Sequence, residues 1–161
     1  MPPTIADLWN ELLHLMPEEE RGFSNEPATE SEIEKLETTI GAKLPDEFRE
    51  LLQATNGNSR DCSSDHHLYP PLLTVEQLIL THQDTLDEIN PENTIETMEF
   101  SYEWMRGILL FADEDGAGFV LELANGHVWS WDHDGWFFTK KADSIRELLE
   151  KTIDDREFWS L

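Results

Sequence analysis

The chain has 161 residues, with 11 Lys and Arg against 35 Asp and Glu, a formal net charge of −24 and a hydrophobic share of 39%. This length predicts a single domain, and eight Phe and six Trp supply large side chains for its core. The charge argues against DNA, RNA and anionic lipid surfaces as partners, because all of them are negative themselves, and favours a basic protein partner.

The negative charge is concentrated in the middle of the chain. Between Asp61 and Thr139 the sequence has sixteen acidic residues and a single cation, Arg106. A surface that keeps the protein soluble explains this surplus as well as a binding face does. Charge alone therefore leaves both interpretations open.

Cysteine use and hydropathy indicate the compartment. A lone Cys62 excludes an intramolecular disulfide and suits a reducing environment. The first residues do not resemble an export signal, and no apolar run reaches the length of a membrane span. We therefore expect a cytoplasmic protein.

Apolar residues at helical spacing predict four helices in the first part of the chain. Capping-box pairs mark three of the helix starts, at Thr4, Thr29 and Thr74, and the remaining helix begins at Leu44-Pro45. Residues 17–28 are expected to form an exposed linker and residues 58–67 a polar loop. The predicted helices span about residues 4–16, 29–41, 44–56 and 75–89.

Further along the chain the apolar pattern alternates, which predicts strands at residues 108–112, 119–123 and 127–132. Asn125-Gly126 predicts a tight hairpin between the last two, and residues 113–118 a looser turn. Asp134-Gly135 starts a further hairpin into residues 136–138, and Ser144 caps a last helix. This order predicts an α+β fold, with one antiparallel-rich sheet covered on one face by about four helices.

Patterns for phosphate, metal or covalent chemistry do not fit the sequence. It has no Gly-rich phosphate loop, and Asp113–Gly116 places its glycine fourth, whereas a calcium-binding EF-hand loop places it sixth. Cys62, His66 and His67 share one loop but lack the spacing of a zinc site and the separated members of a catalytic triad. We expect no catalytic residue, no cofactor and no metal.

The aromatic hairpin is the strongest candidate for a binding surface. Trp129 and Trp131 share one face of their strand. One interpretation buries both indoles under helices, since an indole covers a large area; the other makes at least one an exposed contact within an acidic rim. In the second case the candidate partner-binding residues are Asp113, Glu114, Asp115, Glu122, Trp129, Trp131, Asp132 and Asp134.

The stretch from Ile33 to Gly57, IEKLETTIGAKLPDEFRELLQATNG, resembles the SUKH superfamily, in the branch named after the yeast SMI/KNR cell-wall regulators. GILLFADEDGAGFVLEL is similar to the family's strand, acidic-Gly turn and strand, and the helix from Ile145 to its closing helix. The resemblance runs from about Thr29 to Asp155, without a counterpart for residues 73–106. The matching positions of the first stretch are Glu37, Ile40, Gly41, Leu44, Pro45, Phe48, Leu51, Leu52, Asn56 and Gly57.

The resemblance implies an α+β fold with four helices and one sheet, and a role in binding rather than catalysis. Bacterial members look like immunity proteins that bind and inhibit toxins encoded beside them, often nucleases. We therefore expect a monomer that neutralises a cognate toxin domain, whose basic groove an acidic surface can occupy. The alternative is a non-catalytic signalling or scaffold module, as in the fungal members.

Overall fold

The computed structural model describes residues 1–18, 24–58, 70–88, 102–114, 116–132 and 137–159. Within them lie the helices α1 (Ile5–Leu15), α2 (Glu30–Ile40), α3 (Asp46–Ala54), α4 (Val75–Glu88), α6 (Tyr102–Arg106), α7 (Ile145–Asp154) and the short 3-10 helix η2 (Arg156–Trp159). Strands β1 (Ile108–Glu114), β2 (Ala117–Glu122), β3 (Val128–Asp132) and β4 (Phe137–Ala142) form one antiparallel sheet in that order. The predicted α+β class is confirmed. None of the described helices is both long and apolar enough to cross a membrane.

Four helices begin where the sequence predicted. In each, the hydroxyl of the capping residue accepts the backbone N–H three residues further on, which satisfies a group that the helix itself leaves open. In α1 and α2 the carboxylates of Asp7 and Glu32 in turn accept a hydrogen bond from the backbone N–H of the capping residue. This bond lowers the pKa of both carboxyls below the usual range. The capping residues are Thr4, Thr29, Thr74 and Ser144.

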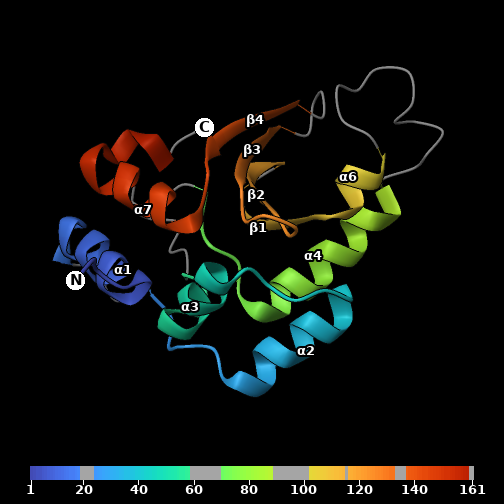
Figure 1. Ribbon diagram of the computed structural model, residues 1–161, viewed down its shortest axis with the longest axis horizontal. Helices are drawn as coiled ribbons and strands as arrows, with labels where there is room; N and C mark the ends of the chain where they lie inside the picture. The colour runs from blue at the N-terminus through green and yellow to red at the C-terminus, as the bar shows by residue number, and fades with distance from the viewer. Residues whose placement is uncertain (19–23, 59–69, 89–101, 115, 133–136, 160–161) are drawn as a thin grey trace.

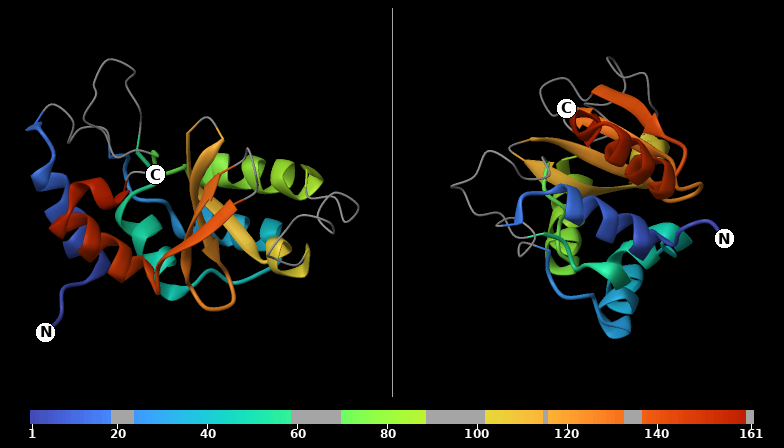
Figure 2. Two further views of the ribbon diagram at one scale, coloured as in Figure 1. Left: turned by 90° about the horizontal axis from the view of Figure 1, so that it is seen from above. Right: turned by 90° about the vertical axis from the view of Figure 1, so that its left-hand side faces the viewer.

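Most helices lie on one face of the sheet (Figure 1). α4 contacts β1 and α7 contacts β4, while Phe48 of α3 meets the ring of Phe111 edge-on at 5.4 Å. α1 packs against α3 and α7, and α2 against α3 and α4 (Figures 1 and 2). The largest buried side chains of the resulting core include Trp9, Phe48, Phe111, Phe119 and Trp159.

The opposite face of the sheet is also covered, by the short helix α6, which the sequence did not predict. Met105 of α6 packs into a second, smaller apolar cluster on this face. Strand residues point alternately to the two faces, and here both sets include apolar side chains. The members of this second cluster are Met105, Ile108, Leu110, Val120, Trp131 and Phe138.

The two central turns differ from the prediction. Glu114 pairs with Ala117, so β1 and β2 are joined by two residues, and Gly116 has a φ of 87°. Between β2 and β3 the connection takes four residues, because the Glu122 N–H bonds to the carbonyl of His127. β2 and β3 pair antiparallel, so the hairpin predicted at Asn125-Gly126 is confirmed, but its expected two-residue turn is wrong; the shorter connection lies between β1 and β2, where a looser turn was expected.

The linker expected to be exposed over residues 17–28 is only partly so in its described residues, 17–18 and 24–28: Glu18, Glu26 and Pro27 are exposed, but the segment is bonded to the rest of the fold. The N–H of Ala28 donates to the carbonyl of Leu52 at 2.8 Å, and that of Asn25 to Gly57 at 3.1 Å. Ala28 is buried in the core. These bonds fasten the segment along the end of α3, a tertiary contact that local sequence does not encode.

Candidate functional site

Two partly exposed indoles border the second cluster. Trp104 of α6 meets Trp129 of β3 edge-to-face, with ring centres 5.5 Å apart, and meets Phe138 of β4 at 5.1 Å. Edge-to-face contacts favour a fixed mutual orientation of the rings. Three aromatic rings therefore join α6 to β3 and β4, while Trp104 and Trp129 remain partly accessible to solvent.

The carboxylate of Glu122, at the end of β2, orients the indole of Trp129. Its Oε2 atom accepts the Nε1–H of Trp129 at 3.2 Å, and Nδ1 of His127 lies 3.7 Å from the same oxygen. The Glu122 side chain is only 16% exposed. The indole of Trp129 is thus held in one orientation by contacts within the chain.

Two of the predicted acidic residues lie at the same end of the sheet. Asp113 is in register with Gly118 and Asp132 with Ala117, so the first residues of β2 separate them. Asp132 is exposed and Asp113 is partly buried. This arrangement places two carboxylates at one end of the sheet, and alternation along the strands directs Asp113 to the second face and Asp132 to the opposite one.

Of the remaining predicted residues, the structure describes the side chain of Trp131 but not those of three acidic residues. Trp131 is 8% exposed and belongs to the second cluster, so Trp129 is the more accessible of the two indoles. Glu114 ends β1, but its side chain lies outside the described residues, as do Asp115 and Asp134.

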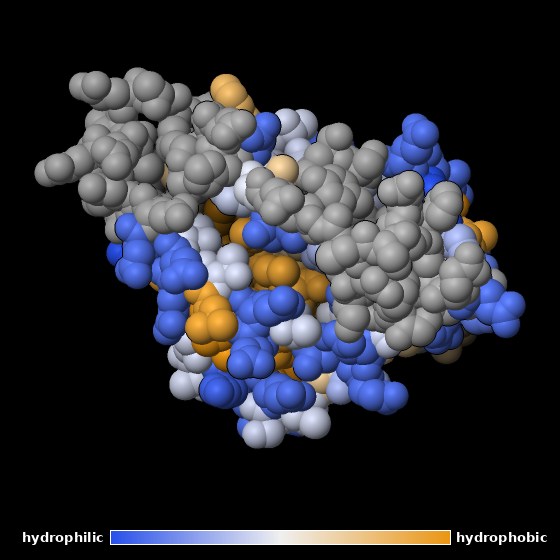
Figure 3. Space-filling view, turned by 180° about the vertical axis from the view of Figure 1, so that it is seen from behind, coloured by the Kyte–Doolittle hydropathy of each residue, from blue (hydrophilic) through white to orange (hydrophobic). Residues whose placement is uncertain are grey.

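The face seen from behind the view of Figure 1 is mainly hydrophilic in its described part (Figure 3). Apolar side chains reach the surface there as a small group in the middle, bordered by polar and charged ones. A broad apolar patch would mark a large hydrophobic interface. The visible part of this face suits a polar contact instead.

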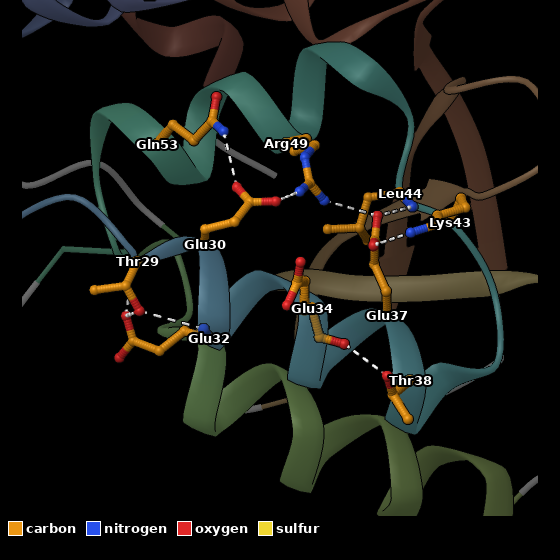
Figure 4. Close-up of polar contacts among 10 residues, drawn as sticks. All are labelled: Thr29, Glu30, Glu32, Glu34, Glu37, Thr38, Lys43, Leu44, Arg49 and Gln53. Carbon is orange, nitrogen blue, oxygen red and sulfur yellow. Dashed lines mark hydrogen bonds and ion pairs between the residues drawn. The ribbon is translucent and has the colours of Figure 1, made fainter.

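A buried carboxylate, Glu37, joins the end of α2 to the start of α3 (Figure 4). Its Oε1 accepts the backbone N–H of Leu44 at 3.1 Å and pairs with Nη1 of Arg49 at 3.0 Å. Its Oε2 pairs with Nζ of Lys43 at 2.8 Å. Arg49 also pairs with Glu30, so the network links three segments of the chain.

The charge of Glu37 is maintained by these donors. Burial alone raises the pKa of this carboxyl, but the bonds from Lys43 and from the N–H of Leu44 outweigh it and lower the pKa. A depression of about 500 Å³ adjoins Glu37 and is bordered by Glu34, Thr38 and Lys43. Because the carboxylate is already bound by three donors, we assign this corner a structural role.

Within the described residues, no group of three or more His, Cys, Asp or Glu side chains could hold a metal ion. The loop with Cys62, His66 and His67 lies outside those residues. The structure therefore adds no test of the prediction made for that loop.

Comparison with known families gives a match over residues 27–151 to the SMI1/KNR4 family, SUKH-1. The chain belongs to this family. The resemblance found in the sequence is confirmed, and the match also spans residues 73–106, which the resemblance had left without a counterpart. A comparison with curated proteins gave no match.

In this SMI1/KNR4 chain the Asn-Gly pair after α3 forms a junction between helices. Oδ1 of Asn56 accepts the N–H of Val75 at 2.7 Å and so caps α4. Gly57 has a φ of +77°, and a Cβ there would lie 2.9 Å from backbone atoms of residues 72–74. The sequence had shown this pair only as the end of a helix.

The Leu-Pro pair of the family pattern, Leu44-Pro45, lies directly before α3 and marks the start of this helix, as the sequence predicted. Pro45 is the residue before the first turn of α3, where its missing N–H leaves no helical bond unmade. The apolar positions of this segment all belong to the main core; they are Leu44, Phe48, Leu51 and Leu52.

Proposed function

We propose that this SMI1/KNR4 protein is an immunity-type inhibitor that binds a cognate toxin domain in the cytoplasm and neutralises it. The charge distribution is the observation that carries the proposal. Sixteen acidic residues and one cation between Asp61 and Thr139 make the middle of the chain attractive to a basic protein and repulsive to nucleic acid. The family resemblance, which implies binding rather than catalysis, supports the same reading.

The contact surface that we propose combines an acidic rim with an aromatic anchor. Asp113 and Asp132, at one end of the sheet, attract a basic partner from a distance. Trp129 supplies the apolar contact, and Trp104 and Glu122 fix its ring in advance. A side chain that is already ordered loses less conformational entropy on binding.

Neutralisation of a nuclease would follow from competition. The groove of such an enzyme carries cations that bind phosphates, and a protein whose acidic surface occupies those cations excludes the substrate. This mode of inhibition makes and breaks no covalent bond. It weakens as salt screens the charges.

The proposal is tested by expressing the product of the neighbouring gene, the expected toxin, with and without this chain. We expect the wild-type chain to restore growth and to co-purify with the toxin as a stable complex. Asp113→Asn with Asp132→Asn, and separately Trp129→Ala, should reduce protection.

A matched control removes two exposed carboxylates elsewhere, by Asp46→Asn on α3 with Asp154→Asn on α7. This control should protect as well as the wild type. If the neighbouring product is harmless, or kills equally in the presence of this chain, the immunity role is wrong and a scaffold role replaces it.

A further inference from the structure

Glu122, unlike the buried Glu37, has no Lys or Arg within ion-pair distance among the residues that the structure describes. Its side chain is 16% exposed, and Nδ1 of His127 lies 3.7 Å from its Oε2 atom. Glu37, in contrast, is paired with both Lys43 and Arg49. A carboxylate withdrawn from water needs a compensating cation, and an imidazole supplies one only when it is protonated. Glu122 therefore carries a charge that the described chain compensates weakly.

Lys140, on the same face of the sheet, does not supply the missing cation. It lies opposite Trp129 in the register of β3 and β4, and Glu122 accepts a hydrogen bond from that indole. The ammonium of Lys140, however, pairs with Asp143. A second molecule is therefore the source from which a cation can reach Glu122 without breaking an ion pair of the described chain.

The indole of Trp129 lies beside this charge. Its Nε1–H donates to Oε2 of Glu122 at 3.2 Å, so the carboxylate borders the edge of the ring, and within the described chain no donor reaches the other oxygen, Oε1. Trp104 meets the same ring edge-to-face, and both indoles are partly exposed. Among aromatic side chains the indole attracts a cation most strongly. The site thus presents an aromatic ring and a carboxylate oxygen side by side.

We infer that Glu122 and Trp129 together receive an arginine side chain of the basic partner. A guanidinium is planar and weakly hydrated, so it can lie against the indole and at the same time donate N–H groups to Oε1 of Glu122. The ammonium of lysine is a strongly hydrated point charge and fits this pair of groups less well. The inference rests on the proposed function, because it names the partner side chain that the Trp129 anchor binds.

Glu122 and the acidic rim should act on different steps of binding. Glu122 ends β2, whereas Asp113 and Asp132 are in register with the first residues of that strand. An exposed charge such as Asp132 acts mainly on the association rate, because it attracts the partner from a distance. A charge pair enclosed at the contact acts mainly on the dissociation rate. The enclosed position of Glu122 therefore assigns it to holding the bound partner.

The first experiment needs no toxin. The indole N–H resonances of the ¹⁵N-labelled full chain are followed by NMR while N-acetyl-arginine amide is added to about 50 mM at constant ionic strength, a range that suits the weak affinity of a single side chain. We expect the Trp129 resonance, identified by its loss in Trp129→Phe, to shift saturably. The Trp159 resonance should stay in place, because that indole is buried and bonded to Pro70. The neutral analogue N-acetyl-citrulline amide should cause no saturable shift.

Glu122→Gln removes the charge but keeps an oxygen that can accept the indole N–H of Trp129. This variant should raise the dissociation constant of the arginine probe about fivefold or more. Glu34→Gln is the matched control, since Glu34 is an exposed carboxylate on α2, and it should leave the constant unchanged. The Trp159 resonance, which should be the same in both variants and in wild type, reports that the fold is intact.

Three results with the probes would overturn the inference. They are no saturable shift of Trp129, an equal shift with the citrulline probe, and equal affinities of wild type and Glu122→Gln for the arginine probe. N-acetyl-lysine amide that binds as tightly would overturn the choice of arginine.

The second experiment uses the product of the neighbouring gene and separates this inference from the proposed function. The complex with Glu122→Gln should dissociate faster than the wild-type complex, with an association rate close to that of wild type. If the product does not bind the wild-type chain, the proposed function is wrong, whereas the arginine site is still decided by the probes. If the product binds and Glu122→Gln dissociates at the wild-type rate, the inference alone is wrong.

Discussion

The indole N–H of Trp159, in the last described turn of the chain, donates to the backbone carbonyl of Pro70 at 2.7 Å, and both groups are buried. Pro70 directly precedes the residues that pair with the outer edge of β1. The ring of Trp159 also meets that of Phe119 at 5.1 Å. The C-terminal turn thereby fastens the segment that closes one edge of the sheet.

Replacing this indole should weaken the fold although the new side chain remains aromatic. Trp159→Phe removes the donor to Pro70 and leaves a buried carbonyl without it, which should cost about 2 kcal/mol of the free energy of unfolding. The urea midpoint measures this cost. Phe137→Ala, at an exposed position, should shift the midpoint little, and equal shifts for the two variants would contradict the packing described.

Gly57 should tolerate a side chain far less well than Gly41, although both have positive φ. A Cβ at Gly57 would lie 2.9 Å from three backbone atoms, whereas nothing lies within 4 Å of one at Gly41. Gly41→Ala should cost about 1 kcal/mol from backbone strain. Gly57→Ala adds overlap with residues 72–74 and should cost about 3 kcal/mol. Similar urea midpoints for the two variants would show that the junction is loose.

Loss of the Glu37 charge should destabilise the α2–α3 corner. Glu37→Gln retains an acceptor for the N–H of Leu44 but weakens the contacts with Arg49 and Lys43, at a cost of about 2 kcal/mol near neutral pH. Because the folded pKa lies below the usual 4.5, this stabilisation is present above that value and is lost as the pH falls through the folded pKa. The difference between wild type and variant should therefore shrink in acid.

The control for Glu37 is Glu34→Gln, an exposed carboxylate one turn earlier on the same helix. Its effect on the urea midpoint should stay within about 0.5 kcal/mol at any pH. If Glu34→Gln and Glu37→Gln behave alike, the buried network contributes nothing to stability.

His82 should make the protein less stable in mild acid. The residue is 5% exposed, and burial lowers the pKa of its imidazole from the usual 6.5. The unfolded chain then takes up a proton at higher pH than the folded chain, so stability is complete above the unfolded pKa and falls as the pH drops below it. Urea midpoints at about pH 7.5 and 5.5 should differ less in His82→Gln than in wild type. An identical pH dependence would assign the effect to other groups.

Local signals in the sequence predicted those features that depend on few neighbours. The caps at Thr4, Thr29, Thr74 and Ser144 each need only the residue three positions on. The apolar stripe of α3 reflects burial on one side of a single helix. The strands β1, β2 and β3 were found from their apolar residues, although burial along β2 is continuous rather than alternating because both faces of the sheet are covered. These elements appear close to their predicted bounds.

Features that depend on distant contacts were not predicted. In the sequence Glu37 is one of 35 acidic residues and looks like a surface residue. Its neighbours in the sequence do not indicate that it will bind Arg49 and the N–H of Leu44. α6 is only five residues long, which is too short for a periodic pattern. The role of its Trp104 depends on ring contacts with Trp129 and Phe138, which belong to strands of the sheet. The Trp129 indole, likewise, is partly buried by an element that the sequence did not show.

The most direct test of the proposed function is the rate at which this chain associates with the product of the neighbouring gene. The variant Asp113→Asn, Glu114→Gln, Asp115→Asn removes Asp113 of the proposed rim together with the two acids that follow it in the sequence. The variant Asp46→Asn, Glu50→Gln, Asp154→Asn removes three exposed acids elsewhere. Rim charges act chiefly on the association rate. We predict that the first variant associates more slowly than the second and has a flatter dependence on salt, whereas association rates equal to those of the control at every salt concentration would contradict the account.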